Sequence, residues 1–152
     1  MRSSLNLLPG LALALTSSFV AAQSNLGELL DAGAARLSAA EFREQIVQRT
    51  IVGPTPSGSD LEIMYIQNGS IQGLGKGGTT PQLLLFNAPI AGDWTIDESE
   101  RICTALRITP STGFVTILPA RCQFWFKLGD AYFLSDLDSD RRAKVLRRTF
   151  KP

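Results

Sequence analysis

The sequence has no histidine among its 152 residues, and its only cysteines are Cys103 and Cys122. Histidine is the commonest catalytic base near neutral pH and the commonest ligand of transition metals in proteins. Its absence excludes serine–histidine–aspartate triads, cysteine–histidine dyads and the usual histidine-containing zinc sites. An enzyme built on this chain would therefore depend on carboxylate, lysine or tyrosine chemistry.

The chain also has little net charge and few long apolar runs. It contains 15 lysines and arginines against 14 aspartates and glutamates, so the overall charge gives no reason to expect nucleic acid or an anionic membrane surface as a partner. Beyond residue 22, no apolar run approaches the length of a membrane-spanning helix, and the run at 82–86 has the length of a strand. We expect no nucleic-acid partner, no membrane-spanning segment and no cofactor.

The apolar run at the start of the chain has the pattern of a secretory signal peptide. A positive start at Met1-Arg2 precedes an apolar segment at 5–15 and small residues at 20–22 that suit a cleavage site. We predict that residues 1–22 are removed on export. Residues 23–152 would then form one domain in the periplasm or outside the cell.

The two cysteines lie 19 positions apart on different predicted strands. An exported protein folds in an oxidising compartment, so we predict a Cys103–Cys122 disulfide. In the chain-entropy model this bond stabilises the fold by about 3 kcal/mol. Because Cys122 shares a strand face with Phe124 and Phe126, we expect the bond to be buried. A redox role is not favoured, since the chain has no Cys-x-x-Cys spacing.

Helical signals are confined to the beginning of the domain. Ser38 and Glu41 have the spacing of a capping box, and Leu37 and Phe42 occupy the positions of a hydrophobic staple. These residues predict a helix over 38–49, preceded by a weaker helical segment.

Strand signals fill the rest of the chain, and Gly, Pro, Asp or Ser separates most of them. Asn68-Gly69 predicts a tight hairpin turn. The predicted strands are 61–67, 70–74, 82–87, 93–96, 102–108, 114–118, 121–128, 131–137 and 144–150. We therefore predict an α+β domain in which the N-terminal helix packs on an antiparallel β-meander, either a curved sheet or a small barrel, with one disulfide.

Five residues are candidates for contact with a partner. Trp125 alternates with the Cys122 face of its strand, so it would be an exposed anchor in an open sheet and a buried residue in a covered one. Gly75 and Lys76 belong to a glycine-rich segment, 73–80, that we predict to be a loop between strands.

The other two candidates, Arg147 and Arg148, lie in a basic C-terminal strand. Such a strand is either a solvated edge that resists pairing with other chains or a surface for an anionic partner.

Four short motifs occur in order along the domain: Leu-Ser-x-x-Glu at 37–41, Gly-x-Trp at 92–94, the two cysteines, and Gly-Asp-x-Tyr at 129–132. In this order they resemble a group of small secreted proteobacterial domains of unknown function. The resemblance implies a periplasmic or secreted location and transfers no catalytic residue. The domain size, the single disulfide and the predicted small β-barrel also resemble those of the periplasmic lysozyme inhibitors. Ser-Gly-Ser at 57–59 is only weakly similar to the inhibitory loop of those proteins, and we predict a turn there.

These features favour a non-catalytic exported binding module of the bacterial envelope that engages a protein partner, for example as an enzyme inhibitor. One alternative is a barrel-type carrier of a small apolar ligand, with a cavity lined by Phe124, Phe126 and Phe133. Another is a carboxylate-dependent hydrolase that uses acidic residues of 93–100.

Overall fold

Antiparallel strands make up most of the structure. The computed structural model describes residues 23–56, 58–78, 86–110 and 113–152, so the predicted signal peptide at 1–22 lies outside the described residues. The elements are α1 (Leu26–Asp31), β1 (Ala35–Arg36), α2 (Ala39–Gln45), β2 (Thr50–Pro54), β3 (Ser59–Tyr65), β4 (Ser70–Gly78), β5 (Phe86–Ile96), β6 (Ile102–Ile108), β7 (Thr116–Ile117), β8 (Arg121–Leu128), β9 (Ala131–Ser135) and β10 (Leu146–Phe150).

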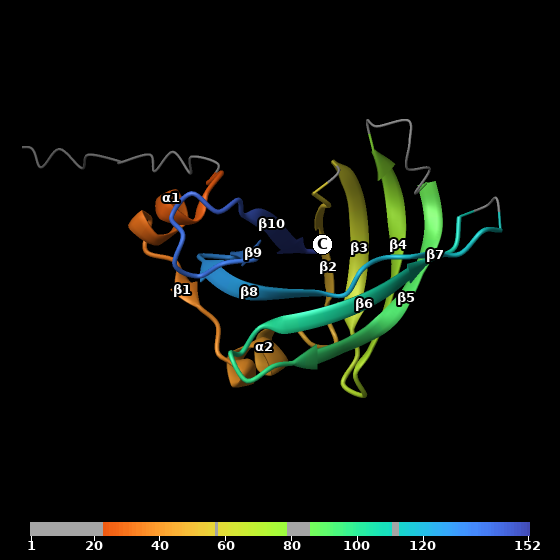
Figure 1. The fold of residues 1–152 in the computed structure, drawn as a ribbon, viewed down its shortest axis with the longest axis horizontal. Coiled ribbons are helices and arrows are strands. Elements are labelled where there is room, and N and C mark those ends of the chain that lie inside the picture. The colour runs from red at the N-terminus through yellow and green to blue at the C-terminus, as the bar shows by residue number, and fades with distance from the viewer. Residues whose placement is uncertain (1–22, 57, 79–85, 111–112) are drawn as a thin grey trace, which may run out of the picture.

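Eight strands of the described residues form a closed barrel. Their order is β8, β9, β10, β2, β3, β4, β5 and β6, and β6 pairs back with β8 to complete the ring. Neighbouring strands are antiparallel throughout. Figure 1 shows β2, β3 and β4 standing side by side, while β6 and β8 cross the middle of the view and β5 curves round beneath β6. The predicted antiparallel sheet is confirmed, and of the two forms proposed for it the structure shows the barrel. No helix in the described part of the chain has the length and apolar character needed to cross a membrane.

The barrel closes along a short seam between β6 and β8. The two strands are paired only at residues 102–104 and 121–123, and the disulfide joins the middle pair, Cys103 and Cys122. The predicted disulfide is therefore confirmed. Its predicted burial is wrong, because both cysteines are only half-buried and the apolar cluster beneath α1 begins further along β8, at Phe124.

Both faces of β8 and β9 are buried, and each face belongs to a different apolar cluster. The cluster in the barrel interior includes Trp125, Tyr132 and Leu134, whereas the outer cluster joins Phe124, Phe126 and Phe133 to Leu26 and Leu29 of α1. The alternation predicted for 121–128 is confirmed. The prediction that the three phenylalanines line a cavity is wrong, because the apolar face of α1 covers them on the outside of the barrel.

The N-terminus of α2 has the local structure that its sequence predicts. Ser38 N donates to Glu41 Oε2 at 2.8 Å, and Glu41 N donates to Ser38 Oγ at 3.3 Å, which completes the capping box. The helix is shorter than the predicted 38–49. Gln48 adopts a positive φ of 67° and donates its N–H to Tyr65 O at 2.7 Å, so the backbone has left the helix before β2 begins.

Strand β4 runs through much of the segment that we predicted to be a loop. A Cβ at Gly73 would lie 2.2 Å from Glu62 O, and a Cβ at Gly92 of β5 would lie 2.1 Å from Ala105 O. These glycines permit close approach of neighbouring backbones in a strongly curved sheet. The loop prediction for 73–80 is wrong as far as residue 78, and the last two positions lie outside the described residues.

Candidate functional site

The barrel contains a cavity of about 400 Å³. This volume lies within the range of roughly 300–1,000 Å³ that is common for small-molecule sites. Strands β3, β5, β6, β9 and β10 each contribute aliphatic side chains from their inward faces. The aliphatic part of the wall consists of Leu61, Ile63, Ile90, Leu106, Ile108, Leu118, Leu134 and Leu146.

An aromatic cluster fills the barrel interior on one side of this cavity. The Phe42 ring of α2 contacts the rings of Tyr65, Trp94 and Trp125 edge-on, at centroid distances of 5.2, 5.6 and 5.1 Å. Tyr65 also lines the cavity, and the other three rings do not. Tyr65 therefore marks the boundary between the filled and the hollow part of the interior. Figure 1 shows α2 at the lower end of the view, beside the end of β5.

Trp125 is only 2% exposed. Of the two alternatives for this residue, the buried one holds, because its ring packs against Phe42 and Tyr65 inside the barrel. The hypothesis that Trp125 is a surface anchor for a partner is therefore corrected: it is a core residue.

Arg148 is the charged residue that is most buried among those lining the cavity, with 4% exposure. Strand β10 pairs with β9 on one side and β2 on the other, so its predicted role as a solvated edge is wrong. Alternation along β10 then directs Arg148 inward with Leu146, and leaves Arg147 exposed on the outer face.

The guanidinium of Arg148 is held by backbone carbonyls. Its Nη1 donates to Pro54 O at 2.6 Å and to Arg147 O at 2.9 Å. Among the described residues, no carboxylate forms an ion pair with it, and its buried Nε has no hydrogen-bond partner. Burial lowers the pKa of Arg148, while Tyr65 and the exposed Asp60 oppose that change. An arginine nevertheless stays protonated near neutral pH.

A second arginine at the cavity wall is already paired. Arg121 donates through Nε and Nη2 to the two carboxylate oxygens of Asp136, at 2.9 and 2.5 Å. Gln123 donates to Asp136 Oδ1 at 3.0 Å. Hydrogen bonds from Arg121 and then Gln123 lower the pKa of Asp136. The positive charge of Arg121 is thus balanced by an ion pair, whereas Arg148 forms no ion pair with a carboxylate of the described residues, and of these carboxylates only the exposed Asp60 acts on its charge.

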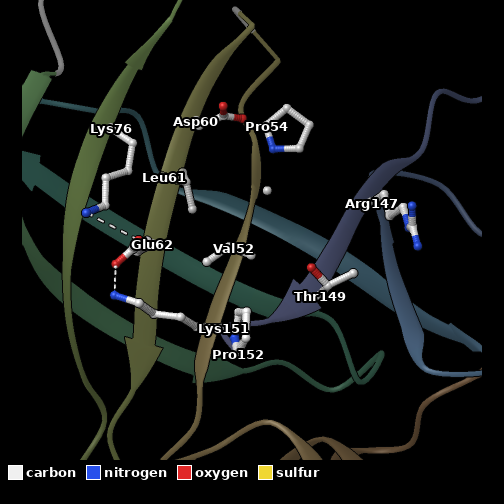
Figure 2. Close-up of a pocket in the computed structure, with 11 residues that line it drawn as sticks. Val52, Pro54, Asp60, Leu61, Glu62, Lys76, Arg147, Thr149, Lys151 and Pro152 are labelled. Carbon is white, nitrogen blue, oxygen red and sulfur yellow. Dashed lines mark hydrogen bonds and ion pairs between the residues drawn. The ribbon is translucent and has the colours of Figure 1, made fainter.

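The outer face of the same strands carries two of the predicted partner-binding residues. Lys76 and Arg147 line a surface groove of about 560 Å³ over β10, β2, β3 and β4, and Figure 2 shows Glu62 between Lys76 and Lys151. The carboxylate of Glu62 accepts from Lys151 at 2.8 Å and lies 3.2 Å from Lys76 Nζ. The hydrogen bond from Lys151, with a further contribution from Lys76, lowers the pKa of Glu62. Gly75, in contrast, is buried in β4.

The acidic turn between β5 and β6 has a structural role. Asp97 accepts hydrogen bonds from the backbone of Ser99 and Arg101 and from the Arg101 side chain. Glu100 accepts from Ala39 N at 3.0 Å. These groups lie outside the cavity.

One three-residue group has metal-ligand spacing within the described chain: Asp97, Cys103 and Cys122. Its two sulfur atoms are bonded to each other, so thiolates are not present to bind a metal ion.

Comparison with models of protein families, with curated proteins and with solved structures finds no match to this chain. The geometry of the described residues is therefore the basis for assigning a function. The turn expected at 57–59 includes residue 57, which lies outside the described residues.

The basic neighbours of Arg148 predict a surface position for it, and the structure places it inside the barrel instead. The sequence contains a signal for this inward orientation. Leu146, Arg148 and Phe150 share one phase of the period-two pattern, while Arg147 and Thr149 share the other. The two apolar residues of the first phase indicate that Arg148 points inward.

Proposed function

We propose that the protein is an exported, non-catalytic binding module whose barrel holds a small, largely apolar molecule. The observation that carries this proposal is the cavity of about 400 Å³ with aliphatic side chains on most of its wall. An apolar molecule that enters it would remove apolar surface from water, which is favourable by about 25 cal/mol per Å². The residues that line this cavity differ from the phenylalanines expected from the sequence.

The closed end of the barrel supports a binding role. We assign α2 the role of a plug, because Phe42 is 1% exposed and contacts three aromatic rings of the interior. With this end filled, the cavity has a rigid floor at Tyr65. Rigid, preformed walls reduce the entropy that binding would otherwise cost.

The chemistry of the wall also supports binding over catalysis. The described residues that line the cavity include arginine, tyrosine, threonine and glutamine, but no carboxylate, lysine or cysteine. A hydrolase of the kind considered above needs two carboxylates at the reacting bond. Export is supported by the signal-peptide pattern of 1–22 and by the disulfide, which suits an oxidising compartment.

A fluorescence titration with the neutral apolar dye N-phenyl-1-naphthylamine tests this function. We expect saturable binding of one dye per barrel, and an affinity at least about tenfold lower in Leu106→Trp, whose larger ring fills the cavity. Ala105→Trp is the matched control, because residue 105 is exposed on the outer face of the same strand and does not line the cavity. Equal affinities in the two variants, or no saturable binding to the parent protein, would contradict the proposal.

A protein partner on the outer groove is the second candidate. It is favoured by the exposed positions of Lys76 and Arg147 in one groove, where three cationic side chains, Lys76, Arg147 and Lys151, outnumber the two carboxylates, Asp60 and Glu62. This excess of positive charge suits an acidic protein surface. Cross-linking in cells, repeated with the double variant K76E/R147E, tests this candidate: loss of one cross-linked species supports it, and an unchanged pattern opposes it.

A further inference from the structure

The charge of Arg148 is unusual for its position in the barrel. The side chain is 4% exposed and lies in a wall that is mostly aliphatic. Transfer of a charge from water to such a place is costly unless the charge is paired. Two carbonyl oxygens accept hydrogen bonds from Nη1, and the exposed Asp60 acts on the charge without forming an ion pair, so the charge is not paired inside the barrel.

A second unsatisfied polar atom lies near the same part of the wall. Among the described residues, the buried side-chain atoms without a hydrogen-bond partner are Arg148 Nε and Ser59 Oγ. Both residues lie near the end of β2, since the Arg148 side chain donates to Pro54 O, while the backbone N of Ser59 donates to Oγ1 of Thr55, just after β2, at 3.1 Å. Buried donors in folded proteins are nearly always satisfied, and Arg148 lines the cavity, so its unpaired Nε is a donor that an acceptor bound in the cavity would satisfy.

Tyr65 adds a further polar group to the cavity wall. Burial raises the pKa of its hydroxyl, and the nearby charge of Arg148 opposes the rise only in part. The hydroxyl therefore stays protonated near neutral pH. A protonated phenol donates a hydrogen bond to an anionic acceptor.

We infer that the natural ligand is a single-chain amphiphile with a carboxylate head group, and that Arg148 holds this carboxylate inside the barrel while the aliphatic wall holds the chain. This inference rests on the proposed binding function and names its ligand class. One guanidinium balances one negative charge, which favours a carboxylate over a phosphate monoester that carries up to two.

The aliphatic wall accounts for the apolar part of such a ligand. Leu61 and Leu146 line the cavity on the strands that flank β2, and Ile108 and Leu134 line it on β6 and β9. An inorganic anion would leave these side chains without a partner. An uncharged hydrocarbon would leave Arg148 without one, so the two halves of the cavity together favour an amphiphile.

Competition against N-phenyl-1-naphthylamine tests the inference with decanoate, decanol and decyl phosphate at neutral pH. We expect decanoate to bind at least about tenfold more tightly than decanol, because a hydrogen bond to a charged group is stronger than one to a neutral group. Decyl phosphate should bind more weakly than decanoate. In Arg148→Met the preference for decanoate over decanol should disappear, while decanol and the dye still bind.

Arg147→Met is the matched control, because it removes the same charge from the neighbouring residue on the outer face. It should keep the full preference for decanoate. Equal binding of decanoate and decanol by the parent protein overturns the carboxylate inference and leaves the apolar cavity in place. A tighter complex with decyl phosphate overturns the choice of head group. Failure of the dye and of all three amphiphiles to bind overturns the binding function itself.

If Arg148→Met does not fold, the relative affinities of the parent protein for decanoate, decanol and decyl phosphate still test the inference. Arg148→Lys supplies a second variant that retains the positive charge but not the bidentate geometry of a guanidinium. We expect it to keep part of the preference for decanoate. Complete loss of the preference in Arg148→Lys would support bidentate recognition of the carboxylate by the guanidinium. A full preference for decanoate retained in Arg148→Met would contradict an Arg148–carboxylate contact.

Discussion

Replacement of both cysteines by serine should destabilise the barrel by about 3 kcal/mol. The bond closes a loop of 19 residues, and the chain-entropy model gives about 11 cal/mol/K for a loop of this size. Few other interactions would compensate for the loss of the bond, because only three residue pairs join β6 to β8 at the seam where the barrel closes. Serine fits these half-buried positions without creating a large cavity.

Denaturation by guanidinium chloride, followed by tryptophan fluorescence, measures the effect. The two tryptophans, Trp94 and Trp125, lie in the aromatic cluster of the barrel interior and report its disruption. We expect the free energy of unfolding to fall by about 3 kcal/mol and the melting temperature to fall by roughly 10 °C for a domain of this size. Treatment of the parent protein with a reductant should reproduce the double substitution.

Hydrogen exchange locates the change. Amide protection at residues 102–104 and 121–123 should decrease more than protection in β3 and β4, which form seven residue pairs away from this seam. An unchanged free energy of unfolding in oxidising buffer, or a uniform loss of amide protection, would refute the inference that this disulfide stabilises the pairing of β6 with β8.

Three further substitutions test other parts of the structure. Ser38→Ala removes the cap of α2 and should cost about 1 kcal/mol in urea denaturation, whereas a cost below about 0.3 kcal/mol would contradict a functioning capping box. Gly73→Ala places a Cβ 2.2 Å from Glu62 O and should cost about 1–3 kcal/mol; full retention of stability would show that β4 relaxes easily. For Tyr65, whose pKa is raised by burial, the neutral form is favoured in the folded state. Stability should therefore fall as the pH rises above about 10, by up to about 1.4 kcal/mol per pH unit, and Tyr65→Phe should remove that part of the slope. The same alkaline slope in both proteins would contradict the effect of burial on Tyr65.

Local signals in the sequence were sufficient for several elements. Ser38 and Glu41 identified the start of α2, since a capping box depends on residues three positions apart. Asn68-Gly69 identified the β3–β4 turn, where Gly69 has a φ of 90°. The alternation over 121–128 was also recognisable, because one strand alone displays it.

Other features depend on strands that are distant in sequence. The closure of the barrel requires β6 to pair with β8 as well as β5, and nothing within either strand specifies both neighbours. Gly73 was interpreted as a loop residue because its requirement comes from the backbone of Glu62 on the adjacent strand. Strand β2 was missed because Gly53-Pro54 is typical of a break, although here it ends a strand paired with β3.

The candidate site was the least predictable part of the molecule. Which face of β8 and β9 points into the barrel depends on α1, whose Leu26 and Leu29 cover the phenylalanines from outside. The position of Arg148 depends in turn on β10 lying between β9 and β2. An isolated strand sequence does not contain this information, so a basic terminal strand was more simply interpreted as a surface.

The most direct test of the barrel as a binding site is a measurement of contacts between ligand and protein by NMR. Protein with labelled methyl groups would be mixed with decanol, and nuclear Overhauser effects from the chain of the alcohol would be assigned. We predict contacts to Ile108 and Leu134, which line the cavity, and none to Leu74 and Leu137, which are 37% and 48% exposed and do not line it. Contacts to the exposed leucines without contacts to the cavity residues would contradict a ligand inside the barrel.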